Sequence, residues 1–170
     1  MIETPRLILR EYTDDDFAEL HRIVSDPVTM SFWPEPFSED KSRQWIGWSV
    51  ESHKNRGFGR LAMILKETNE FIGDAGFGYI LVNEKPENDL GYIVAKEHWR
   101  RGYGTEAAIA CRDYGFNELN FTRIVANMAF DNVPSRLVAE KAGMTKETEF
   151  YNSRNRGILT LLYSLEKKHN

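Results

Sequence analysis

The chain has 170 residues, of which 41% are hydrophobic and 28% are charged, and its formal net charge is −4. This composition is typical of a globular domain, so we expect a single domain over residues 1–170 and exclude a disordered or fibrous protein. The negative charge argues against nucleic-acid binding, which usually needs a basic face. No apolar run approaches the roughly 20 residues of a membrane span, so we expect a cytoplasmic protein without a membrane partner.

Cysteine and histidine are too sparse to predict a disulfide or a metal site. Cys111 is the one cysteine and cannot form an internal disulfide, and its place in a helical run favours burial. The four histidines lie far apart and lack the spacing of metal ligands. We therefore expect no metal.

The first half of the chain predicts a strand, two helices and three further strands. β-favouring residues mark the strands, and Thr13 with Asp16 forms a capping-box pattern that begins the first helix. In chain order, these elements are expected at residues 6–12, 13–24, 38–53, 60–66, 71–80 and 90–94. The segment 26–37 is rich in proline and aromatic residues, which either line a pocket or pack on the core.

The second half predicts a helix, a strand, a helix and two strands. Asn132 followed by Pro134 is typical of a helix start, and Gly143 of a helix end. The expected positions are residues 105–118, 123–130, 133–142, 145–151 and 157–165. A strand, helix and strand over residues 90–130 require a parallel crossover beside antiparallel hairpins, so the sheet should be mixed.

A glycine-rich turn joins the two halves and has the pattern of an anion site. Glycines permit close approach of the backbone, and the following helix offers unpaired N–H groups. Gly102, Gly104 and Ala107 also fit the dinucleotide pattern G-x-G-x-x-A, whereas a Walker A loop is excluded by the missing lysine. A simple connection and a dinucleotide-dependent enzyme remain alternatives at this point.

Two motifs at a characteristic separation, WRRGYGTEA at residues 99–107 and NVPSRLVAEKAGM at 132–144, resemble the GNAT superfamily of N-acetyltransferases. The opening TPRLILR at residues 4–10 is similar to the Rim-type branch, the ribosomal-protein N-terminal acetyltransferases. The resemblance covers nearly the whole chain. It implies an α+β fold with a mixed six- to seven-stranded sheet flanked by about four helices. It also implies acetyl-CoA-dependent transfer to a primary amine, either a protein N-terminal α-amine or a small-molecule amine.

The resemblance also implies the residues that bind coenzyme A. The pantetheine arm is assigned to the backbone of Ile93, Val94 and Ala95. The pyrophosphate is assigned to Arg100, Arg101, Gly102, Tyr103, Gly104 and Thr105, with Asn132 and Arg136 as further contacts. The family often has glycine where this chain has Arg100. Ala139 replaces the tyrosine that many members use as general acid, so Ser135 becomes the candidate partner of the leaving sulfur.

The implied chemistry needs a base, an oxyanion donor and an acceptor pocket. Asp89 shares a strand face with Gly91 and is the first candidate base. The alternative is that Asp89 is a solvated charge at the start of the strand, without a catalytic role. Asp74 is the second candidate base. A backbone N–H near Val94 would bind the oxyanion. We expect the acceptor pocket to be lined by Phe32, Trp33, Phe37 and Tyr151. A coenzyme-binding module without turnover remains an alternative because of Ala139, and a homodimer stays open.

Overall fold

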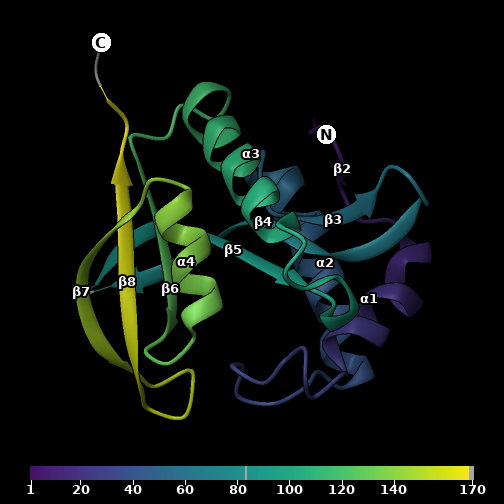
Figure 1. The fold of residues 1–170 in the computed structure, drawn as a ribbon, viewed down its shortest axis with the longest axis horizontal. Helices are drawn as coiled ribbons and strands as arrows, with labels where there is room; N and C mark the ends of the chain where they lie inside the picture. The colour runs from purple at the N-terminus through teal and green to yellow at the C-terminus, as the bar shows by residue number, and fades with distance from the viewer. Residues whose placement is uncertain (83, 169–170) are drawn as a thin grey trace.

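The computed structural model describes residues 1–82 and 84–168, which form a sheet with helices on both faces (Figure 1). The strands are β1 (Ile2–Glu3), β2 (Leu7–Arg10), β3 (Arg60–Leu65), β4 (Glu70–Val82), β5 (Lys85–Val94), β6 (Arg123–Ala129), β7 (Thr145–Asn152) and β8 (Ile158–Glu166). The α-helices are α1 (Phe17–Val24), α2 (Glu39–Arg56), α3 (Tyr103–Asn117) and α4 (Val133–Lys141). Short 3₁₀ turns cover Asp14–Asp16 and Lys96–His98. Within these two ranges, no helix is long and apolar enough to cross a membrane.

The strands form one sheet in the order β1-β2-β3-β4-β5-β6-β8-β7. Among the described strands, β5 and β6 form the one parallel pair, so the expected mixed sheet with four flanking helices is confirmed. The sheet has eight strands, more than expected, because the two-residue β1 pairs with β2. A strand this short leaves no periodic pattern in the sequence. β5 also begins at Lys85, earlier than expected, because β4 pairs with it along its whole length.

The helix starts follow the local signals in the sequence. Thr13 and Asp16 form the expected capping box, although a 3₁₀ turn precedes α1. The Asn132 side chain accepts a hydrogen bond from the Ser135 N–H at 3.1 Å and caps α4. These bonds satisfy N–H groups that helix starts otherwise leave unpaired.

The sheet separates two hydrophobic cores. The core under α3 and α4 includes Met63 and Phe77, and the core under α1 and α2 includes Ile64 and Ile93. Side chains along a strand alternate between the two faces. On β5, Tyr92 and Val94 therefore point toward α3 and α4, whereas Asp89, Gly91 and Ile93 point toward α1 and α2.

Strands β5 and β6 meet at one end and separate at the other (Figure 1). The two strands pair in parallel at Asp89 and Val125. Beyond this pair, β5 continues to Val94 and, among the described residues, is paired only with β4. The gap between the two strands therefore opens toward their carboxyl ends. In doubly wound and related sheets, this is where ligands bind.

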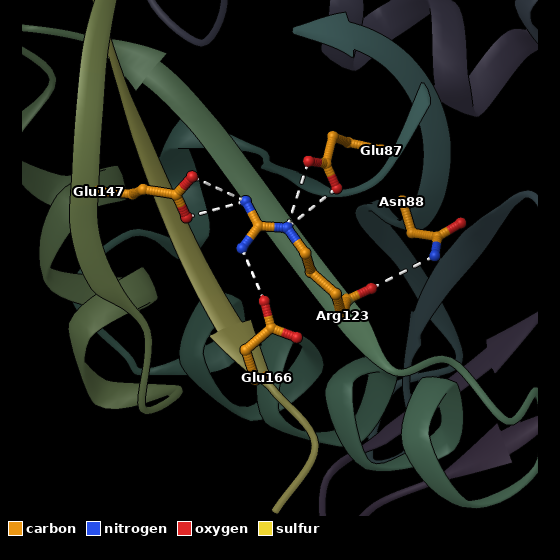
Figure 2. A network of polar contacts seen from close by, with 5 residues as sticks. All are labelled: Glu87, Asn88, Arg123, Glu147 and Glu166. Atoms are coloured by element: carbon orange, nitrogen blue, oxygen red, sulfur yellow. Dashed lines mark hydrogen bonds and ion pairs between the residues drawn. The ribbon is translucent and has the colours of Figure 1, made fainter. Parts of the chain in front are cut away.

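A polar network holds the closed end of the gap together (Figure 2). The Arg123 guanidinium at the start of β6 donates to Glu166 on β8 and Glu147 on β7, both at 2.8 Å, and to Glu87 on β5 at 3.1 Å. Asn88 donates its side-chain N–H to the Arg123 carbonyl oxygen at 3.2 Å. The network joins four strands at one point and fixes where β5 and β6 begin to diverge.

Candidate active site

Beyond Asp89, one edge of β5 has no strand partner in the part of the chain that the structure describes. The Ala95 N–H donates to the Ile72 carbonyl oxygen of β4 at 2.9 Å. Because residues of a strand alternate between its two edges, Ile93 also faces β4, whereas Tyr92 and Val94 turn their N–H and C=O groups toward the gap. The Val94 carbonyl oxygen accepts a hydrogen bond from Trp99 Nε1 at 2.7 Å. This edge of β5 is suited to pair with an extended amide chain.

The loop after β5 enters α3 through two left-handed residues. Arg100 has a φ of 62° and Gly102 a φ of 81°, and α3 begins at the next residue. A left-handed backbone is unfavourable for arginine, which explains why glycine is the residue expected at position 100. The first turn of the 15-residue helix α3 then presents unpaired N–H groups beside two exposed arginines. Together these features suit a pyrophosphate.

Arg6 of the N-terminal segment holds this loop in place. Its Nε lies 2.6 Å from Glu106 Oε2, and its Nη1 donates to the Arg101 carbonyl oxygen at 2.9 Å. The guanidinium carbon lies 4.5 Å from the centre of the Tyr103 ring. The position of the loop therefore depends on a contact with Arg6 in the N-terminal segment of the chain.

The predicted cofactor residues divide into those that offer side chains and those that offer only backbone. Ile93, Ala95 and Tyr103 have buried side chains that pack in the cores. At Gly104, an added Cβ would lie 3.6 Å from Val94 Cγ2, which is ordinary contact. Thr105 is partly exposed in the first turn of α3. The fold would therefore accept a methyl group at Gly104, and any need for glycine in place of alanine there would come from a ligand.

The start of α4 lies across the gap and contacts β5 through a tyrosine that the sequence analysis missed. The Tyr92 hydroxyl donates to the Ser135 carbonyl oxygen at 2.7 Å, and the Ser135 hydroxyl donates to the Tyr92 oxygen at 3.1 Å. Burial raises the pKa of Tyr92, so it remains a neutral phenol. The alternation of side chains along a strand could have placed Tyr92 on this face of the sheet. Its contact with Ser135 on α4 could be found only from the folded structure. The residue after Ser135 in α4 is Arg136, whose Nε lies 3.8 Å from Glu140 Oε1.

Asp89 lies at the point where β5 and β6 separate. Its Oδ1 accepts a hydrogen bond from Asn127 Nδ2 at 2.9 Å. Burial of the carboxyl group raises the pKa of Asp89 to about 6, although the Asn127 bond and the charge of Arg60 both favour the ionised form. A carboxylate that titrates near neutral pH is suited to accept a proton from an amine.

Asp74, the second candidate base, is committed to a buried network. Both of its oxygens are occupied, one by Arg60, whose Nε lies at 2.6 Å, and the other by the Tyr12 hydroxyl and by Trp45 Nε1 at 3.0 Å. Asp74 is fully buried and Arg60 is 5% exposed. An ion-paired carboxylate with this many donors has no lone pair directed at a substrate. Asp74 therefore holds Arg60 in place, and Asp89 is the better candidate base.

The predicted acceptor residues lie in different environments. Phe37 is buried in the core, with Trp33 packed edge-on against it at 5.6 Å between ring centroids. The Phe32 carbonyl oxygen accepts a bond from Asn155 at 3.0 Å, which joins the α1–α2 loop to the β7–β8 turn. Tyr151 is 78% exposed at that end of β7. The two segments expected to face each other are thus linked, but Phe37 offers no surface to a ligand.

Comparison with known proteins agrees with this geometry. Residues 6–145 match the family model described as an acetyltransferase (GNAT) domain. The chain is 33% identical to the uncharacterized N-acetyltransferase p20 of Bacillus licheniformis over 174 residues, which covers 97% of this chain and 95% of the relative.

Solved structures show the same fold. An acetyltransferase from Agrobacterium tumefaciens is 28% identical, with a TM-score of 0.83 over 98% of this chain and 94% of that one. The ribosomal-protein α-N-acetyltransferase RimL, solved with coenzyme A, is 18% identical, with a TM-score of 0.79 over 96% of this chain and 95% of that one, and shares the fold. The family model spans most of the sheet, the loop before α3 and all of α4. The chain therefore belongs to the GNAT family of acetyltransferases.

Proposed function

We propose that the protein transfers the acetyl group of acetyl-CoA directly to a primary amine. One observation carries the proposal: β5 separates from β6 after Asp89, and the gap is bordered by the free edge of β5 and by the starts of α3 and α4. This arrangement offers an amide-binding edge next to an anion-binding helix start. The RimL structure, which has a similar fold and is 18% identical in sequence, contains coenzyme A.

The residues along the gap fit coenzyme A chemically. The loop from Arg100 to Thr105 supplies N–H groups and two arginines for the pyrophosphate. The outward-facing N–H and C=O groups of Tyr92 suit an amide of the pantetheine arm, whereas the Val94 C=O already accepts a hydrogen bond from Trp99. Ile93 and Ala95 support that edge from the β4 side, since the Ala95 N–H is bonded to Ile72. Asn132 caps α4, and Arg136 on the same helix, which is partly exposed and 3.8 Å from Glu140, would meet a further phosphate.

When bound, acetyl-CoA supplies the acetyl group as an activated thioester. Asp89 would take a proton from the acceptor ammonium, directly or through water, because its pKa of about 6 keeps it ionised at neutral pH. The Val94 N–H, which points into the gap, would donate to the acetyl oxygen. Ser135 would donate a hydrogen bond to the sulfur in place of the one that its hydroxyl donates to Tyr92. The bond from the Tyr92 hydroxyl to the Ser135 carbonyl oxygen holds the residue at the gap.

The test is release of free thiol from acetyl-CoA by the purified protein, across a panel of amines and peptides with free N-termini. A Gly104→Ala variant serves as a control. It should fold, because an added Cβ makes only ordinary contacts with Val94 and Val138, but it should bind coenzyme A more weakly. A wild-type protein that binds coenzyme A and releases no thiol would contradict the proposal and favour a binding module without turnover. That alternative is motivated by Ala139, which stands where many family members have a tyrosine and is buried, with 1% exposed.

The natural acceptor is either a protein α-amine or a small amine. The Rim-type likeness favours the first, but one fold supports many acceptors. Mass spectrometry of a cell lysate incubated with the protein and acetyl-CoA would separate these cases by the size of the acetylated product. Stabilisation by NAD and not by coenzyme A would instead revive a dinucleotide-dependent enzyme.

A further inference from the structure

Trp48 of α2 lies over the β4–β5 pair that carries Asp89, although it is far from Asp89 in sequence. The edge of the Trp48 ring, at Cη2, lies 3.4 Å from the position that a Cβ of Gly78 would occupy. Gly78 is the direct partner of Asp89 in the β4–β5 ladder, so the two share one face. Cβ positions of such partners are about 5 Å apart. Because Gly78 has no side chain, the indole reaches the face of the β4–β5 pair on which Asp89 lies.

Trp48 is also accessible to a ligand. Its exposed fraction is 39%, whereas its neighbour Trp45 is partly buried and donates to Asp74. The two indole rings lie 5.7 Å apart. Trp45 therefore supports Trp48, and part of the Trp48 side chain stays exposed above the strand pair that carries Asp89.

The charges around Asp89 leave it without a partner of opposite sign. Arg60 lies on the same face and close to Gly91, where an added Cβ would be 1.9 Å from Arg60 Nη1. Arg60 is held by Asp74, with Nε at 2.6 Å from Oδ1, so these two charges cancel. Asn127 is neutral. When Asp89 is ionised, the three charged groups together carry one net negative charge, beside an indole surface.

We infer that Asp89 and Trp48 bind the ammonium group of the acceptor, and that the acceptor has no carboxylate on the carbon bearing its amine. The inference rests on the proposed acetyl transfer and adds the class of acceptor. An ammonium is attracted both by a carboxylate and by an indole surface. A neighbouring carboxylate on the acceptor would meet the charge of Asp89, and Arg60, the cation that acts on Asp89, is already paired. Peptide N-termini and simple alkylamines satisfy this requirement, whereas free α-amino acids do not.

The experiment is calorimetric titration of coenzyme A-loaded protein with three matched probes: 2-phenylethylamine, L-phenylalaninamide and L-phenylalanine. We expect the first two to bind at least about tenfold more tightly than L-phenylalanine because of like-charge repulsion. If L-phenylalaninamide binds more tightly than 2-phenylethylamine, the acceptor is a peptide N-terminus. If 2-phenylethylamine binds more tightly, the acceptor is a small amine. Equal or tighter binding of L-phenylalanine would overturn the inference.

Three variants test the role of Trp48. Trp48→Leu should weaken 2-phenylethylamine binding about tenfold, Trp48→Phe should retain most of it, and Val50→Ala, at an exposed position on the same helix, should leave it unchanged. Coenzyme A affinity should stay constant in all three, which confirms that they fold. If Trp48→Leu binds the amine as well as the wild type does, the inference is wrong. Amine binding that depends on Trp48 without thiol release would keep the inference and contradict only the proposed function.

Discussion

Replacing Gly91 by alanine should destabilise the protein through one contact. The new methyl group would lie 1.9 Å from Arg60 Nη1 and 3.0 Å from its Cζ, so the guanidinium must move. Arg60 is 5% exposed and bonded to fully buried Asp74, so movement breaks a buried ion pair. Losing such a pair costs about 3 kcal/mol or more. For a chain of this length, that corresponds to a melting temperature lowered by about 6–12 °C.

Urea unfolding followed by circular dichroism measures this cost directly. The matched control is Gly47→Ala in α2, where an added Cβ meets nothing within 4 Å. That variant should gain about 1 kcal/mol from helix propensity alone. In a background where Arg60→Met and Asp74→Leu remove both charges, Gly91→Ala should cost at most about 1 kcal/mol. Wild-type stability for Gly91→Ala, or an equal cost in both backgrounds, would refute the reasoning.

Three further changes test the active site and the closed end of the gap. Asp89→Asn should lower kcat/KM about a hundredfold; the wild-type rate should rise with pH through about 6, where Asp89 loses its proton, and the variant should lack this step. Ser135→Ala should lower kcat at least about tenfold with little change in the KM for acetyl-CoA, whereas a changed KM alone would point to a binding role. Arg123→Gln should lower the free energy of unfolding by about 2 kcal/mol at pH 7, because three carboxylates lose their counter-ion. A hydrogen bond with Ser164 and the pairing with Arg123 lower the pKa of Glu147, so this difference should shrink as the pH falls and the carboxylates are protonated.

The elements of the fold were predictable where local patterns determine them. The capping box at Thr13 and the Asn132 cap are short-range signals, and both appear in the structure. β1 and the first half of β5 were missed because they become strands only through their partners. An acidic run such as residues 84–89 has little strand propensity by itself.

The candidate site was less predictable because its key contacts join distant segments. Motifs indicated the loop before α3 and the serine of α4, since glycines and caps act locally. The bonds of Tyr92 to Ser135 and of Arg60 to Asp74 depend on which strands are neighbours. Phe37 was predicted to line the pocket, but it is 2% exposed, because apolar residues in loops also fill cores.

We expect the sparse pairing between β5 and β6 to divide the molecule into two units during folding. From β1 to β5, the order of strands in the sheet equals their order in the chain, so this unit can form from neighbouring segments as they are synthesised. β6 joins through a parallel crossover and needs β8, which follows later in the chain. Such non-local pairing is slow. We expect coenzyme affinity to appear in the last refolding phase, after most secondary structure has formed.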